Sequence, residues 1–90
     1  MSARAIGYIV RTGAYGDSVT DYKYCATREL VEAELVDMGW MDNPALFVYK
    51  VTKGEDPAEL IQSLAYDSVD PYPDWIVEFN GPHSPKWTRA

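Results

Sequence analysis

The chain has 90 residues, of which 47% are hydrophobic and 24% are charged, and its formal net charge is −6. This composition excludes an intrinsically disordered chain, and the length predicts a single domain. The negative charge argues against direct nucleic-acid binding and against docking on anionic membranes. Both need clustered Lys and Arg, whereas the eight basic residues are scattered along the sequence.

The first part of the sequence predicts a β-hairpin. Residues 5–11 are rich in β-forming side chains, and strand alternation places Ile6, Tyr8 and Val10 on one face. The segment 12–18 is interrupted by two glycines, which is typical of a turn. Residues 19–26 form the return strand, and we expect cross-strand aromatic pairs to stabilise the hairpin.

A helix is predicted from an N-cap at Thr27 to about Met38, with Gly39 in the left-handed position that ends many helices. Its apolar side chains fall on two flanks: Val31, Leu35 and Met38 on one, and Ala33, Val36 and Trp40 on the other. A helix that is apolar on two sides is able to contact a partner as well as its own sheet.

The second half of the sequence predicts two strands and another helix. Residues 45–52 are almost continuously apolar, which favours the centre of the sheet. A helix begins at Asp56-Pro57, a cap followed by a proline at the first helical position, and runs to about Tyr66. After an acidic loop interrupted by prolines, residues 75–80 form the last strand.

The expected architecture is therefore α+β, in the order strand–strand–helix–strand–helix–strand. We expect a four-stranded mixed sheet with both helices on one face, which together form a single domain over residues 1–81. The segment 82–90 is predicted to be a proline-rich C-terminal tail that does not extend the sheet, because proline cannot donate to a β-ladder.

Residues suited to catalysis or metal binding are few. The single cysteine, Cys25, and the single histidine, His83, lie far apart in the sequence, so a nucleophile lacks an evident base and zinc lacks ligands. Three aspartates occur in the segment 67–74, but Val69 and Pro71 occupy positions where a calcium loop needs oxygen ligands. We expect no enzyme, no cofactor and no metal site.

Recognition of a protein surface is the function that this inventory leaves. Seven tyrosines and three tryptophans suit a small core and a binding surface equally. The candidate partner-binding residues are Met38, Trp40 and Met41 after the first helix, Tyr66, Asp70 and Tyr72 around the acidic loop, and Trp87 in the tail. Trp87 either folds back on the core or contacts a partner.

We therefore expect a small acidic, non-enzymatic protein-binding domain, an inhibitor or modulator of a larger protein. A single cysteine fits the reducing cytoplasm, and no apolar run approaches the length of a membrane span. One alternative is a nucleic-acid mimic that blocks a DNA-binding protein. It requires most carboxylates on one face, because about 30 Å of duplex carries on the order of 18 charges. The other is a structural protein that self-associates through a strand edge such as 19–25.

Small size, acidity and aromatic richness, with segments such as VYKVTKGEDPAEL and DPYPDWIVEF, resemble the small orphan proteins of bacteriophages, especially those of actinobacteria. No functional motif defines that group, so the resemblance assigns no role to any residue. It implies a host-directed role, in which the larger protein bound by this chain belongs to the host.

Overall fold

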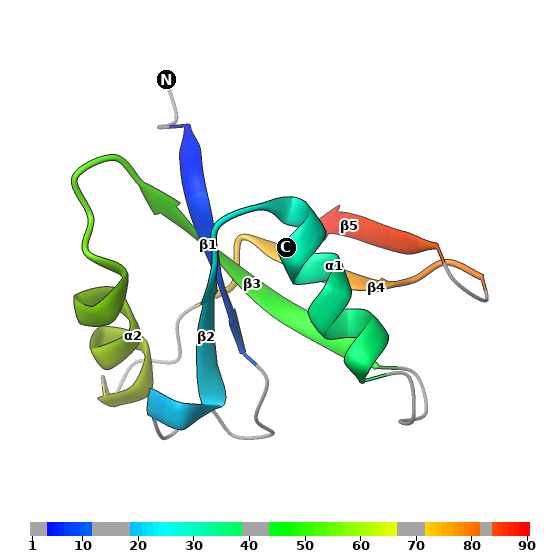
Figure 1. The fold of residues 1–90 in the computed structure, drawn as a ribbon, viewed down its shortest axis with the longest axis horizontal. Helices are drawn as coiled ribbons and strands as arrows, with labels where there is room; N and C mark the ends of the chain where they lie inside the picture. Colours follow the sequence, from blue (N-terminus) through cyan, green and yellow to red (C-terminus); the bar gives the residue numbers. More distant parts are fainter. Residues whose placement is uncertain (1–3, 12–18, 39–43, 67–71, 82–83) are drawn as a thin grey trace.

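The computed structural model describes residues 4–11, 19–38, 44–66, 72–81 and 84–90. In these residues it shows a five-stranded sheet and two helices (Figure 1). The strands are β1 (Ala5–Arg11), β2 (Tyr22–Cys25), β3 (Ala45–Thr52), β4 (Trp75–Phe79) and β5 (Pro85–Arg89). The helices are α1 (Arg28–Asp37) and α2 (Pro57–Tyr66), and a 3-10 helix, Val19–Asp21, precedes β2. This confirms the α+β class.

The sheet differs from the predicted one in the number and direction of its strands. Its spatial order is β2-β1-β3-β4-β5, and each neighbouring pair is antiparallel, so the expectation of a four-stranded mixed sheet is wrong. The predicted strand over 19–26 is shortened to β2, because its first three described residues form the 3-10 helix. The pairing of β1 with β2 and the central place of β3 are confirmed.

The C-terminal segment supplies the fifth strand, so the prediction of a tail that does not extend the sheet is also wrong. Pro85 is tolerated because it is the first residue of an edge strand. Gly81 has φ 98°, in the left-handed region that favours glycine. The backbone N–H of Asn80 donates to the carbonyl of Ser84 at 2.7 Å, which closes the turn between β4 and β5.

The two helices pack against opposite faces of the sheet, not against one face as predicted. Successive side chains of a strand point to opposite sides, so each strand supplies both faces. Leu46 and Val48 of β3 belong to a buried cluster with α1, whereas Tyr49 and Val51 belong to a buried cluster with α2. The almost continuous apolar character of residues 45–52 follows from this burial on both sides.

The rings of Tyr8, Trp75 and Trp87 form a cluster on the α1 side of the sheet, and this cluster packs β5 against the core. Their centroids are 5.6 Å apart for Tyr8–Trp75, 5.4 Å for Tyr8–Trp87 and 5.7 Å for Trp75–Trp87, all in edge-to-face geometry. The Trp87 indole Nε1 donates to Glu32 Oε2 at 2.8 Å, and the Arg28 guanidinium lies 4.2 Å from the centroid of the same ring. Trp87 therefore folds back on the core.

Replacing Trp87 with alanine is expected to lower the free energy of unfolding by about 2–3 kcal/mol, because the half-buried ring loses its aromatic contacts and the bond to Glu32. Chemical denaturation followed by circular dichroism measures this. The matched control is Tyr72→Ala, since the Tyr72 side chain is 93% exposed and its loss should change stability by less than about 0.5 kcal/mol. Equal effects of the two substitutions would contradict a packing role for Trp87.

Tyr24 of β2 covers the backbone of β1 at Gly7. A Cβ atom at position 7 would lie 2.6 Å from the Tyr24 hydroxyl oxygen and 2.7 Å from a ring carbon, both too close for an undisturbed ring. Glycine at this position thus allows the tyrosine ring to lie across the neighbouring strand.

Gly7→Ala is therefore expected to destabilise the fold by about 1 kcal/mol, because the new methyl group displaces the Tyr24 ring. In a Tyr24→Ala background the same change should cost less, since the clash is gone and alanine restricts the unfolded chain more than glycine does. A double-mutant cycle from denaturation curves measures the coupling. Additive effects would show that Tyr24 does not restrict position 7.

Candidate functional site

Two of the predicted binding residues, Met38 at the end of α1 and Trp87 in the C-terminal segment, pack against the same buried cluster. Met38 is the C-cap of α1 and is half-buried against the α1-side core. Trp87 is also half-buried, in the aromatic cluster. Trp40 and Met41 lie outside the described residues. Both described members of this group therefore pack within the fold.

The predicted binding residues around the acidic loop are exposed where the structure describes them. Tyr66 ends α2 and is 67% exposed, and Tyr72 precedes β4 and is 93% exposed. Asp70 lies outside the described residues. Because α2 packs on the opposite face from α1, Tyr66 does not share a surface with Met38 or Trp87.

The buried thiol of Cys25 is poorly suited to nucleophilic chemistry. Burial raises the pKa of Cys25, and the nearby charge of Glu34 raises it further, so the thiol stays protonated. Within the described residues, no three His, Cys, Asp or Glu side chains are grouped so that they could hold a metal ion. Neither of the two described helices is long and apolar enough to cross a membrane.

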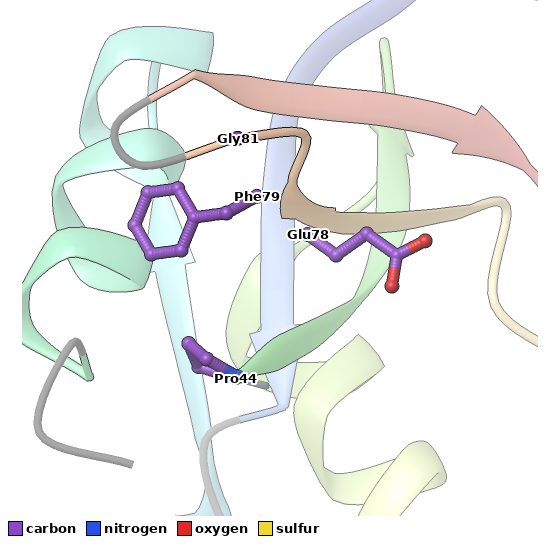
Figure 2. Close-up of a pocket in the computed structure, with 4 residues that line it drawn as sticks. All are labelled: Pro44, Glu78, Phe79 and Gly81. Atoms are coloured by element: carbon purple, nitrogen blue, oxygen red, sulfur yellow. The ribbon is translucent and has the colours of Figure 1, made fainter. Parts of the chain in front are cut away.

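A hollow of about 310 Å³ lies where β3 begins and β4 ends (Figure 2). Its described lining consists of Pro44, Glu78, Phe79 and Gly81. Figure 2 shows the Phe79 ring on the α1 side, whereas the Glu78 carboxylate points away from that ring. The described side chains therefore do not converge polar groups on one point, as a site for a polar small molecule would require.

A second hollow, of about 320 Å³, lies at the start of α2, and its described lining includes the carboxylates of Glu55, Asp56 and Glu59. Two of these are engaged in local structure. The Glu55 carboxylate accepts hydrogen bonds from the hydroxyl and, at 2.7 Å, from the backbone N–H of Thr52, which lower the pKa of Glu55. Asp56 Oδ1 accepts from the backbone N–H of Ala58 at 3.0 Å as a helix cap. The carboxylates of Glu55 and Asp56 thus have a structural role at the start of α2.

The outer face of α1 combines exposed aliphatic side chains with carboxylates around a small residue. Leu30 and Val36 lie three residues before and after Ala33, while Glu29 and Asp37 lie four residues before and after it. At 3.6 residues per turn, all four positions neighbour Ala33 on the helix surface. All five residues are exposed, Leu30 to 51% and Val36 to 61%. We call Glu29, Leu30, Ala33, Val36 and Asp37 the Ala33 face.

The remaining carboxylates of α1 are engaged within the fold and hold the helix in place. Glu34 forms an ion pair with Lys23 of β2, and this hydrogen bond raises the pKa of the Lys23 ammonium. Glu32 accepts from the Trp87 indole. The inner side of α1 packs in the core through Val31 and Leu35, so the position of the Ala33 face is fixed relative to the sheet.

Part of the Ala33 face is predictable from sequence. The helical pattern assigns Ala33 and Val36 to a second apolar flank, but it does not single out Leu30 or the two carboxylates. The signal that finds them is the spacing of three and four residues on both sides of Ala33. The burial of Val31 and Leu35 defines the side of the helix that faces the sheet, and the five residues lie on the opposite side.

The distribution of carboxylates tests nucleic-acid mimicry, and the edge strands test self-association through a strand edge. Carboxylates of α1 lie on one side of the sheet, and those at the start of α2 lie on the other, so the described acidic residues do not gather on one face. The two edge strands are short, β2 with four residues and β5 with five. β5 also begins with Pro85 and carries Lys86 and Arg89, features that oppose strand pairing with a second chain.

Comparisons of the chain with protein-family models, with curated proteins and with solved structures found no match. The assignment of a binding surface consequently rests on the residues and geometry of this chain.

Proposed function

We propose that the chain is a non-enzymatic protein-binding domain that engages a larger protein through the Ala33 face. The observation that carries this proposal is the exposure of Leu30 and Val36, two large aliphatic side chains on one flank of a helix whose other flank is buried. Fully burying an aliphatic side chain is worth about 1.5–3 kcal/mol, so covering two half-exposed ones supplies a useful share of a binding energy.

Val36 is not explained by helix stability. Valine is β-branched and a weaker helix former than alanine, leucine or the long polar residues that suit an exposed helical position. Its side chain is 61% exposed, so it contributes little to the core. A binding role accounts for an aliphatic residue at this position.

The proposed mode of action is occupation of a surface on the partner. A domain of this kind inhibits or modulates the larger protein by covering the place where another molecule would bind. The resemblance to small bacteriophage proteins supports a host protein as the partner, and the single cysteine supports the cytoplasm as the compartment. Neither nucleic-acid mimicry nor edge-strand assembly is favoured, because the described carboxylates lie on both sides of the sheet and both edge strands are short.

Val36→Asp is expected to reduce recovery of the partner at least about tenfold when the tagged protein captures its partner from lysate of the source or host cell. The exposed position should leave the fold intact, which circular dichroism and the unfolding midpoint check. Quantitative mass spectrometry of the captured proteins is the measurement.

The matched control is Tyr66→Asp, which places the same charge at an exposed large side chain on α2. We expect capture by this variant to equal that of the wild-type protein. Loss of capture with Tyr66→Asp but not with Val36→Asp would assign binding to the opposite face. Capture of only a second copy of the chain would favour self-association instead.

A further inference from the structure

We propose that the element of the partner seated on the Ala33 face is a basic amphipathic helix, whose Lys or Arg side chains lie against Glu29 and Asp37. This inference rests on the proposed function and names the chemistry of its partner. It follows from the shape of the face, from the placement of its charges and from the charges of the chain's own helices.

The shape of the Ala33 face suits a helix. Ala33 has the smallest side chain of the five and sits between Leu30 and Val36, so a partner backbone is able to approach α1 closely at this point. The residues around Ala33 form the holes into which apolar side chains of a second helix insert. A helix of ten residues is about 15 Å long, which matches about three turns of a partner helix.

The negative charge of Asp37 destabilises its own helix. Asp37 is the last residue of α1, whose final turn carries no basic residue. A carboxylate there faces the negative end of the helix dipole, which is unfavourable. Lys23 donates its hydrogen bond to Glu34, which is the main cause of its raised pKa. The charge of Asp37 contributes least to that rise in pKa. A partner's cation beside Asp37 would relieve this unfavourable placement.

Glu29 is the second carboxylate available to a partner. The neighbouring Arg28 lies over the Trp87 ring, and the other two carboxylates of α1 are engaged by Lys23 and Trp87. Glu29 and Asp37 are eight residues apart, so they lie about 12 Å apart along the helix axis. Cations about two turns apart on a partner helix match this spacing.

The chain's own helices do not supply such an element. Apart from Arg28, neither α1 nor α2 carries a Lys or Arg, and each has one acidic residue in its first turn, Glu29 in α1 and Glu59 in α2. Docking α1 or α2 of a second copy on the Ala33 face would bring carboxylates toward Glu29 and Asp37. Charge complementarity therefore favours a basic helix from a different protein.

The test selects binders from a displayed library of helical peptides randomised on one face, with the wild-type protein as bait. We expect the enriched peptides to carry apolar residues three or four positions apart with Lys or Arg beside them. Asp37→Asn should weaken their binding at least about fivefold, with no loss of thermal stability in the free protein, since the removed charge faces the negative helix end. Glu59→Gln, the same charge change on α2, should leave binding unchanged.

A double reversal, Glu29→Lys with Asp37→Lys, should switch the selection from basic to acidic peptides. Enriched peptides without basic residues, failure to enrich any peptide, or unchanged binding by Asp37→Asn would each overturn the basic-helix inference. If Val36→Asp still reduces capture from lysate in that case, the proposed binding function stands and only the partner's chemistry is wrong. If Val36→Asp has no effect on capture either, the proposed binding function of the Ala33 face is also wrong.

Discussion

Burial of the central strand β3 on both of its faces is the constraint on which the rest of the structure depends. A five-stranded sheet has two apolar surfaces to cover, and the described residues provide two α-helices of ten residues each for this. One helix is therefore committed to each face. The aromatic cluster around Trp87 packs against the buried core on the α1 side and completes it.

This arrangement also explains why α1 keeps an exposed apolar flank. Among the described residues α2 is the one other α-helix, and it lies on the other side of the sheet, so it does not cover Leu30 and Val36. Two of the four carboxylates of α1 stabilise the fold through Lys23 and Trp87, and the other two border the exposed flank. One side of α1 thus packs against the sheet, and the opposite side is exposed. The proposed function assigns partner binding to the exposed side.

Much of the local structure is predictable from sequence, because it depends on short-range chemistry. The caps show this: Thr27 Oγ1 accepts from the backbone N–H of Leu30 at 3.3 Å, and Asp56 caps α2 as expected. The placement of the helices is less predictable, because an apolar run such as 45–52 indicates burial on both faces without assigning a helix to each face. The strand β5 is not predicted, because Pro82 and Pro85 argue against a strand in the segment 82–90, whereas the packing of Trp87 depends on Tyr8 and Trp75, which are distant in sequence. The candidate partner residues follow from residue type, with methionines and an aspartate beside the aromatic residues, and residue type does not distinguish a packed ring such as Trp87 from an exposed one such as Tyr72.

Methyl-group NMR of the chain, alone and bound to its captured partner, tests the central claim most directly. The account predicts large chemical-shift changes for the methyl groups of Leu30, Ala33 and Val36, which are exposed in the free protein. The methyl groups of Leu60 and Ile61, which pack on the opposite face, should hardly change. Shifts confined to the α2 side, with an unperturbed Ala33 face, would contradict it.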